Sequence, residues 1–536
     1  MKQRRERVTR AWAGAALWLA FVGVLAGFLR AEHKSAGVLA VSTMPRLGTV
    51  DTRYLSFNVE MVEVTGGRFW KPYKAIAGSP EAAKPNAARD PNRAVGGDSD
   101  LYRFRPPIDL SNPRLRKLAA ALGPSYLRVS GTWQNSTYFQ NDDNPALKQP
   151  PEGFKGVLTR VAWKGVIDFS KAIDARLVTS VAISPGVRNS AGVWTPSQAR
   201  AVFDYTKSLG SDIAAAEFMN EPTFPGPGGA PQGYDAAAFA KDVKAFEAFL
   251  RTESPKALFL GPGGVGEGVS LAPGGVKMKL LATDDLLQAT GPVFDAFSYH
   301  FYGAVSRRCM GNTTVDQALS AEWLDRTDVV EQFYAALRNK YLPGKPLWLT
   351  ETGEAACGGD RFAGEFVDAF RFVNQLGSLS QKGVQVVIHN TLASSDYGLL
   401  NEDTLDPRPD YWAALLWKRT MGSTVLDPGA SPNDPSLRIF SHCLEGEKGG
   451  VAVVALNADA THDASVTIPM AGARRTLTAP EMTSAAALLN GTELQAGPDG
   501  SLPPLNGMPA PAGTLHLAPG SITFLTFPTA HNKSCA

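Results

Sequence analysis

Two glutamates stand where apolar segments of the chain end. Residues 346–350 form a short apolar run that passes directly into Glu351 and then into small residues and glycines, as a buried parallel strand does on leaving its sheet. A second apolar run, 214–219, leads into the Asn-Glu-Pro segment at 220–222, whose proline interrupts regular structure directly after Glu221. Catalytic groups of a parallel barrel lie at the carboxyl ends of its strands. The pair therefore predicts chemistry, although either acid alone could also be a helix cap or an ion-pair partner.

The chemistry that two such carboxylates suit is hydrolysis of a glycosidic bond. One carboxyl group protonates the leaving oxygen while the other meets the oxocarbenium-like centre. We assign Glu221 as the general acid/base and Glu351 as the nucleophile, which forms a covalent glycosyl-enzyme intermediate if the two carboxyl groups are about 5 to 5.5 Å apart. Asn220, next to the acid, is expected to hydrogen-bond the sugar 2-hydroxyl.

Other residues near these strand ends complete the pair or compete with it. A third apolar run ends in Ser-Tyr-His-Phe-Tyr and brings His300 and Tyr302 to the same rim. His300 is either a structural residue or part of the site, and the Tyr302 hydroxyl is expected to hold the nucleophile carboxylate ionised. The competing acids are Glu217, expected inside its strand as a neighbour that raises the pKa of the acid, Glu354, expected in the loop after its strand, and Glu267.

The segments that must position these residues alternate between strand and helix. Because the strand interiors are apolar throughout, the alternation predicts an α/β fold, a closed (β/α)8 TIM barrel. The predicted strands are 54–59, 126–129, 177–183, 214–219, 257–260, 294–299, 346–350 and 384–388. The predicted helices are 113–122, with Ser111 or Asn112 as its cap, 161–175, 196–209, 236–251, 280–289, 324–341, 361–381 and 411–421.

After Gly422 the pattern changes to short strand-like segments without helices between them, which predicts a C-terminal β-sandwich. A strand at 37–42 is expected to join its sheet, and 66–109 is expected to be a long surface excursion that carries binding. The sandwich segments are 437–441, 451–456, 464–468, 501–505, 515–517 and 522–527. The predicted units are 1–36 (signal peptide or N-terminal membrane anchor), 37–49 (strand joining the sandwich), 50–421 (barrel) and 422–536 (sandwich).

Composition and cysteines restrict the partners and the compartment. Lys and Arg number 53 against 51 Asp and Glu, and a net charge of +2 gives no reason to expect a nucleic-acid partner. Residues 11–29 carry no charge and follow a basic stretch, which predicts an export signal or, slightly favoured, an uncleaved membrane anchor. An exported chain meets an oxidising environment, where its four cysteines can pair in three ways. Because no CxxC, HxxxH or HExxH spacing occurs, we expect no metal and no cofactor.

Three motifs, AEFMNEP at 216–222, SYHFYG at 298–303 and LWLTETGEAACGG at 347–359, occur in this order on these strands. With them the chain resembles glycoside hydrolase family 79, the heparanase and β-glucuronidase family of the retaining clan A, from about residue 50 to its C-terminus. The resemblance implies cleavage of β-linked glucuronic acid residues in glucuronides or in heparan sulfate-like glycosaminoglycan chains. It also implies Glu221 as acid/base on strand four and Glu351 as nucleophile on strand seven.

The resemblance further implies a set of residues around the sugar. They are Asn220, His300, Tyr302, Gly358, Gly359 and Tyr397. The two glycines would bind the uronic carboxylate through backbone amides, and the last tyrosine would close over the same group. The loop between the nucleophile and these glycines is one residue longer than in the family and contains Cys357.

The resemblance pairs Cys443 with Cys535, a bridge that would pin the C-terminal tail. Cys309 and Cys357 follow neighbouring strands six and seven, so their sulfurs can meet at the rim or remain free. The sequence supports exo and endo action equally. It also leaves open a catalytically inactive glycan-binding or cell-surface protein and a clan A glycosidase of neutral sugars. We expect a monomer.

Overall fold

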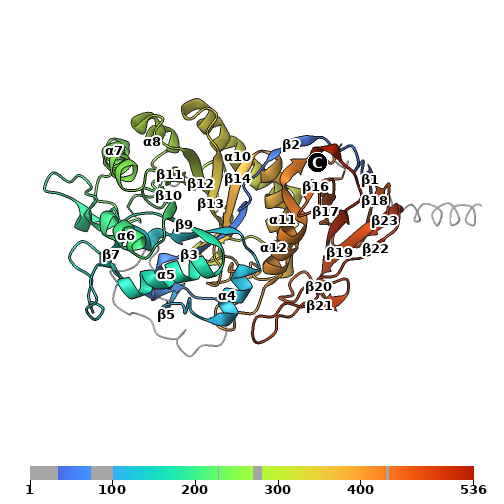
Figure 1. Cartoon of the computed structure of the whole chain (residues 1–536), viewed down its shortest axis with the longest axis horizontal. Helices are drawn as coiled ribbons and strands as arrows, with labels where there is room; N and C mark the ends of the chain where they lie inside the picture. The colour runs from blue at the N-terminus through green and yellow to red at the C-terminus, as the bar shows by residue number, and fades with distance from the viewer. Residues whose placement is uncertain (1–33, 74–100, 227, 270–279, 430–433) are drawn as a thin grey trace, which may run out of the picture.

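The structure is a computed structural model that describes residues 34–73, 101–226, 228–269, 280–429 and 434–536. The segment predicted as a signal or anchor therefore lies almost entirely outside the described residues, as does the middle of the predicted surface excursion. Figure 1 shows two parts side by side, a barrel surrounded by helices and a β domain built mainly from the C-terminal part of the chain.

Eight parallel strands close into a barrel, which confirms the predicted (β/α)8 fold. In chain order they are β3 (Leu55–Glu60), β6 (Ser125–Ser130), β9 (Ala175–Thr179), β10 (Ile213–Glu217), β11 (Leu258–Gly264), β12 (Ala296–Val305), β13 (Leu347–Ala356) and β14 (Val384–His389). Their side chains are largely buried because helices cover the outside and side chains such as Trp348, Tyr126 and Ile388 fill the inside.

Helices follow most of these strands and pack their apolar faces on the barrel. The helix α4 (Pro113–Ala120) has Pro113 in its first turn, and the Asn112 side chain caps it by accepting the N–H groups of Arg114 and Leu115. The helices are α2 (Met61–Thr65), α4 (Pro113–Ala120), α5 (Arg160–Ala172), α6 (Ser197–Ser208), α7 (Ala236–Glu253), α8 (Thr283–Thr290), α9 (Val315–Ala318), α10 (Ala321–Tyr341), α11 (Phe366–Gln381) and α12 (Pro409–Thr420).

The strand that leads to Glu351 ends later than the sequence analysis predicted. β13 does not end at Glu351 but continues to Ala356, because β12 is equally long and the two strands pair along their length as far as Val305 and Ala356. Glu351 therefore sits inside a strand. Glu354 lies on the same strand, whereas the sequence analysis had placed it in the following loop.

The predicted surface excursion is structured at both described ends. β4 (Gly67–Trp70) and β5 (Tyr102–Arg105) form an antiparallel pair, and Trp70 stacks on Tyr102 with ring centroids 4.6 Å apart. Low periodicity hid this pair of strands because each strand has only four residues. A second small sheet joins β7 (Thr137–Gln140) to β8 (Gly156–Thr159).

The C-terminal part forms two sheets. The smaller has the order β1-β18-β23, and the larger runs β2-β15-β16-β17-β24-β19-β20-β21, with β22 beside β19. Their bounds are β1 (Lys34–Val38), β2 (Arg46–Thr49), β15 (Met421–Leu426), β16 (Leu437–Leu444), β17 (Val451–Asn457), β18 (Ala464–Ile468), β19 (Gly472–Thr478), β20 (Leu488–Leu489), β21 (Thr492–Glu493), β22 (Met508–Ala510), β23 (Gly513–Leu517) and β24 (Ser521–Phe527). The strand predicted at 501–505 is absent, because that segment is irregular.

The larger sheet is covered on both faces. On β17, Val451 and Val453 point into the core shared with the smaller sheet, whereas Ala452 and Val454 point into the core shared with the barrel helices. Contacts of α11 with β16 and of α12 with β15 join the two parts. The β domain thus supports the barrel from the side of its last two helices (Figure 1).

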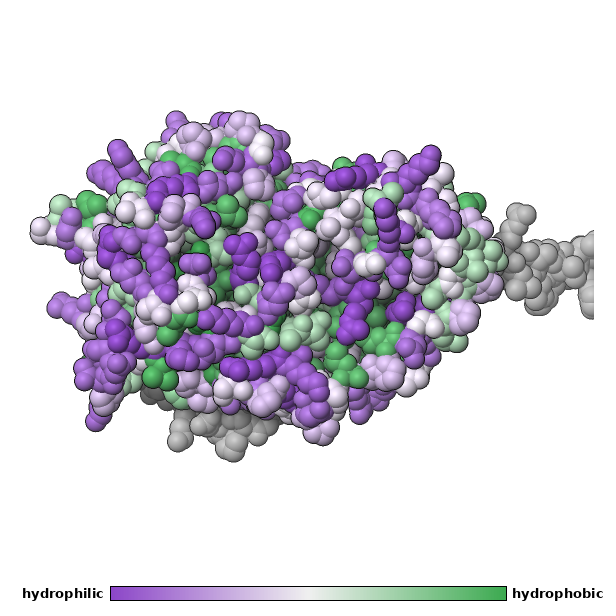
Figure 2. All heavy atoms as spheres, viewed as in Figure 1, coloured by the Kyte–Doolittle hydropathy of each residue, from purple (hydrophilic) through white to green (hydrophobic). Residues whose placement is uncertain are grey.

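All four cysteines are bonded, as Cys309–Cys357 and Cys443–Cys535. No helix within the described ranges combines the length and apolar character needed to cross a membrane. On the face drawn in Figure 2, polar side chains predominate and apolar ones are scattered between them.

Candidate active site

The two predicted catalytic glutamates meet at the carboxyl end of the barrel. Glu351 projects from β13, and Glu221 follows β10 on a turn in which its own backbone is left-handed, with φ of 51°. One carboxylate oxygen of each, together with a ring nitrogen of His300, lie within 4.8 Å of one another. A non-glycine residue in the left-handed region stores strain of about 1–3 kcal/mol, so this turn holds Glu221 in place at a cost to stability.

A buried arginine that the sequence analysis missed connects the whole cluster. Arg128 on β6 has a side chain only 1% exposed. Its nitrogens donate to Glu351 Oε2 at 2.9 Å and to Glu217 Oε2 at 2.9 and 3.0 Å. A further contact of 2.9 Å reaches Asn220 Oδ1. The planar guanidinium therefore fixes the relative position of three strands, and a lysine with one nitrogen could not.

His300 lies between Arg128 and the acid. Its Nε2 is 3.3 Å from a guanidinium nitrogen of Arg128, and its Nδ1 is 3.1 Å from Glu221 Oε1. A guanidinium only donates, so Nε2 accepts and the ring proton is carried by Nδ1, which donates to Glu221. His300 is thus built into the site and orients the acid.

Tyr302 holds the other oxygen of the Glu351 carboxylate. Its hydroxyl donates to Glu351 Oε1 at 2.7 Å, while Arg128 occupies Oε2. The same hydroxyl accepts a hydrogen bond from Asn390 Nδ2 at 3.0 Å. The Glu351 carboxylate therefore has a donor on each oxygen, which fixes its orientation.

The environment shifts the pKa values of Glu221 and Glu217 in opposite directions. Burial raises the pKa of Glu221, and the charge of Glu351 raises it further, against the hydrogen bond from His300. Burial alone would also raise the pKa of Glu217, but the charge and hydrogen bonds of Arg128, with smaller contributions from His300 and Thr350, together outweigh burial, and the pKa of Glu217 is lowered. The expectation that Glu217 raises the pKa of the acid is thus replaced: Glu351 does so, and Glu217 is the counter-ion of Arg128.

Asn220 is almost fully buried and held on two sides. Asn135 exchanges two hydrogen bonds of 2.9 Å with its backbone, and Arg128 donates to its side-chain Oδ1. Because Oδ1 is committed to Arg128, the amide nitrogen is the group directed elsewhere, as recognition of a sugar hydroxyl would need.

The competing acids take structural roles. Glu267 accepts the backbone N–H of Thr283 at 3.1 Å and the Thr283 hydroxyl, at the start of α8. Glu354 accepts the N–H of Asp360 at 2.7 Å, and burial followed by the charge of Asp368 raises its pKa well above the usual value. Three positions separate Glu354 from Glu351 on their strand, so the two side chains point to opposite faces.

The predicted uronate-binding residues lie beside the nucleophile strand, with one difference. The Gly359 N–H donates to Ala355 O at 3.1 Å, so in this state that amide is engaged by its own loop. Gly358 has φ of 83° and packs so closely on Trp70 that an added Cβ would lie 2.5 Å from its Cβ. Tyr397 stacks over Tyr302 with ring centroids 6.4 Å apart.

Sequence signals existed for the residues that were missed. Glu60 ends β3 as a carboxylate, and its Oε1 accepts from Asn390 at 3.2 Å while Oε2 has no hydrogen-bond partner among the described residues. Burial and then the charge of Glu351 raise its pKa well above the usual value. Arg128 is a lone cation inside an apolar strand, and such a residue almost always has a buried partner.

The grouping of Glu221, His300 and Glu351 could in principle ligate a metal ion. The guanidinium of Arg128 lies 2.9 Å from Glu351 and 3.3 Å from His300, however, and its positive charge opposes a second cation there. The geometry of Glu221, His300 and Glu351 therefore suits acid–base chemistry better than it suits binding of a metal ion.

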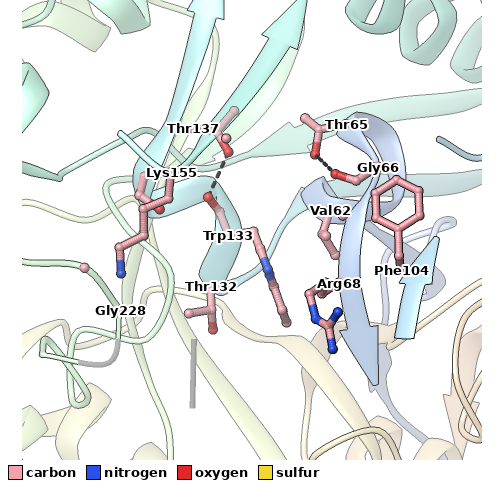
Figure 3. Close-up of a pocket in the computed structure, with 14 residues that line it drawn as sticks. Val62, Thr65, Gly66, Arg68, Phe104, Thr132, Trp133, Thr137, Lys155 and Gly228 are labelled. Carbon is pink, nitrogen blue, oxygen red and sulfur yellow. Dashed lines mark hydrogen bonds between the residues drawn. The ribbon is translucent and has the colours of Figure 1, made fainter. Parts of the chain in front are cut away.

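A cleft of about 270 Å³ opens beside the segment that follows β10, the segment that contains Glu221. It is bordered by Gly228, which lies beside the Asn135 that holds Asn220. Figure 3 shows the indole of Trp133 between Lys155 and Arg68 in this cleft. The half-buried indole and two exposed cations suit a ligand that carries an anionic group.

Known proteins resemble the chain in both sequence and fold. Heparanase-like protein 1 of Arabidopsis thaliana is 28% identical over 381 residues, 67% of each chain. Hyaluronoglucuronidase of Hirudo nipponia is 26% identical over 471 residues, 80% of this chain and 92% of that one. The crystal structure of a 4-O-α-L-rhamnosyl-β-D-glucuronidase from Fusarium oxysporum 12S aligns with a TM-score of 0.60 at 12% identity, covering 92% of this chain and all of that one, and supports the fold. The family model "Glycosyl hydrolase family 79, N-terminal domain" matches residues 106–377, about half of the sequence. The chain belongs to glycosyl hydrolase family 79.

Proposed function

We propose that this protein is a retaining glycoside hydrolase that cleaves β-linked glucuronic acid, with Glu351 as nucleophile and Glu221 as acid/base. The observation that carries the proposal is the approach of one oxygen of each carboxylate to within 4.8 Å, with a donor on each oxygen of Glu351. Inverting enzymes keep the two groups about 6.5–9.5 Å apart to admit a water. The shorter separation supports direct attack by Glu351.

In the first step, Glu351 attacks the anomeric carbon while Glu221 gives its proton to the departing oxygen. Burial and the charge of Glu351 raise the pKa of Glu221, which favours the protonated form needed here. Bond formation converts Glu351 from an anion into a neutral ester. The charge that helped to raise the pKa of Glu221 is then gone, so Glu221 becomes the stronger acid and is left as the base.

In the second step, Glu221 takes a proton from a water that attacks the same carbon, and the bond to Glu351 breaks. Negative charge returns to Glu351, where Tyr302 and Arg128 are already in place to receive it. Their positions are fixed before the reaction, so no reorganisation is needed when the charge develops.

The substrate class follows from the surroundings of this pair and from the relatives. Two of them carry glucuronidase in their names. We assign recognition of the uronic carboxylate to Gly358 and Tyr397, as the resemblance to the family implies; the stacking of Tyr397 on Tyr302, which contacts Glu351, supports this assignment. Arg68 and Lys155 in the adjoining cleft favour a substrate with a second anionic unit, such as a glycosaminoglycan, over a simple glucuronide.

The proposal also covers the cellular compartment, the domain division and the oligomeric state of the enzyme. Two disulfides are typical of proteins that fold outside the cytosol, so we place the catalytic domain there, anchored or released according to the fate of the N-terminal segment. We assign 50–421 to the catalytic unit and 37–49 with 422–536 to a supporting one, in a monomer without metal or cofactor.

The test uses two kinds of substrate. We expect release of nitrophenol from 4-nitrophenyl β-glucuronide, a β-configured first product by NMR, and no release by Glu351→Gln. Heparan sulfate and hyaluronan oligomers of defined length then distinguish removal of terminal sugars from internal cleavage. Binding of these oligomers without any hydrolysis would indicate an inactive glycan-binding protein, and faster hydrolysis of the neutral β-glucoside would contradict the uronide assignment.

A further inference from the structure

Arg308 is a buried cation outside the catalytic cluster, on the turn (Arg307–Cys309) that follows β12. Its side chain is only 1% exposed, and all of its donor groups are engaged. Nε and one terminal nitrogen donate to Lys71 O at 3.0 and 2.8 Å. The other terminal nitrogen donates to Cys357 O at 3.1 Å and to Gly359 O at 2.6 Å. The carboxylate of Asp396 accepts the remaining bond.

These bonds join three loops that lie far apart in the sequence. Lys71 belongs to the segment after β4, Cys357 and Gly359 follow the nucleophile strand, and Asp396 follows the last barrel strand. Tyr73, two residues beyond Lys71, closes the arrangement. Its ring faces the guanidinium at 3.8 Å, and its N–H donates to Asp396 at 3.2 Å.

The bonds to backbone carbonyls also set the direction of the amides. Cys357 O accepts from both Arg308 and the hydroxyl of Ser306 at 3.1 Å. In a trans peptide the carbonyl and the next N–H point in opposite directions, so the N–H of Gly358 is turned away from Arg308. Gly358 O accepts the N–H of Asp396 at 3.1 Å, which ties the glycine loop to the loop that carries Tyr397.

Arg308 is therefore unsuited to bind a substrate carboxylate itself. A sixth acceptor would have to displace one of five existing bonds from a side chain that solvent hardly reaches. Its effect on a ligand must pass through the groups it holds. Two of the three loops that Arg308 joins carry Gly358 and Tyr397.

We propose that Arg308 is the positioning residue for recognition of the uronic carboxylate: it locks the glycine loop to the Asp396 loop and thereby sets the affinity for a charged substituent at C5. This inference rests on the proposed hydrolysis of glucuronides. Arg308 has no bond to Glu221 or Glu351, whose positions depend on Arg128, His300 and Tyr302. Its loss should consequently change KM for uronides and leave kcat nearly intact.

The test compares Arg308→Lys with Arg308→Met and with a matched control, Arg361→Lys. Arg361 is exposed, and its guanidinium faces the same Tyr73 ring at a longer 5.9 Å. Each variant is assayed on 4-nitrophenyl β-glucuronide and on its methyl ester, which has the same leaving group and no charge at C5. The ratio of the two kcat/KM values does not depend on the fraction of folded protein.

For Arg308→Lys and Arg308→Met we expect KM for the glucuronide to rise about tenfold or more, because the substrate carboxylate loses one charge-assisted hydrogen bond. We expect kcat to stay within about threefold of the parent value. The preference for acid over ester should fall by a similar factor, and Arg361→Lys should keep the parent value. An unchanged preference in a folded Arg308 variant overturns the proposal. If neither variant folds, Arg308 serves the fold and not recognition, which also overturns it. A parent protein inactive on both substrates would refute the proposed function instead.

Discussion

Replacing Tyr302 by Phe isolates one hydrogen bond at the nucleophile. The ring stays, so the buried aromatic contact with Tyr397 is preserved, and only the hydroxyl that donates to Glu351 Oε1 at 2.7 Å is removed. Asn390 loses one of three acceptors but keeps Glu60 at 3.2 Å and the Tyr397 hydroxyl at 3.3 Å. Because the buried Glu351 Oε1 loses its donor, we expect the free energy of unfolding to fall by about 1.5–3 kcal/mol.

The effect on the two chemical steps should be unequal. Glu351 loses charge when it attacks and regains charge when it leaves, so a donor on its carboxylate assists the second step and not the first. A hydrogen bond to a charged group contributes about 1.5–3 kcal/mol, which corresponds to about a ten- to hundredfold slower breakdown of the glycosyl-enzyme. The covalent intermediate should accumulate.

Stopped-flow kinetics with 2,4-dinitrophenyl β-glucuronide measure this effect, because that leaving group departs without help. Tyr302→Phe should show a burst of dinitrophenol equal to the enzyme concentration, with kcat reduced far more than kcat/KM. The control is Tyr299→Phe, on the same strand, whose buried hydroxyl has no hydrogen-bond partner in the described part of the chain. Equal losses of kcat and kcat/KM without a burst would refute the reasoning, because Tyr302 would then act in the attack itself.

Three further predictions concern the acid, a buried carboxyl and a disulfide. Glu221→Gln should retain activity on substrates with good leaving groups and lose it on poor ones, and equal loss on all would contradict its role as acid. Because burial raises the pKa of Glu354, its contribution to stability is present below its ordinary pKa and is lost as pH rises through the raised one. In Glu354→Gln the melting temperature should therefore fall less between about pH 5 and pH 8 than in the parent, and parallel profiles would contradict this. Replacing Cys443 and Cys535 by Ser opens a loop of 92 residues and should cost about 4–5 kcal/mol in chemical denaturation, and a loss under about 1 kcal/mol would mean that the tail is held by other contacts.

Periodicity predicted the barrel well because its strands are apolar on both faces and its helices are long. The ends of the strands were harder to predict from periodicity. β13 continues past Glu351 through Thr352, Gly353 and Glu354, residues that look like a loop, because β12 offers a partner at each step. Pairing of this kind is a tertiary effect that local sequence does not encode.

The proximity of Glu221, Glu351 and His300 was predictable because each follows an apolar run in the sequence, although Glu351 and His300 lie inside their strands and not at the strand ends. The same rule applied to Glu60 would have added the third rim carboxyl. The roles of Arg128 and Arg308 depend on contacts between strands and loops far apart in the sequence. Only the fold could reveal that Arg128 bridges Glu217 and Glu351 and that Arg308 ties three loops together.

The central claim is that Glu351 forms the covalent intermediate, and trapping tests it most directly. A fluorinated or epoxide inactivator of glucuronic acid configuration should add one label per chain, and peptide mass mapping should place it on Glu351. Glu351→Gln should remain unlabelled while keeping the melting profile of the parent. A label on Glu354, Glu267 or Glu60 would contradict the account.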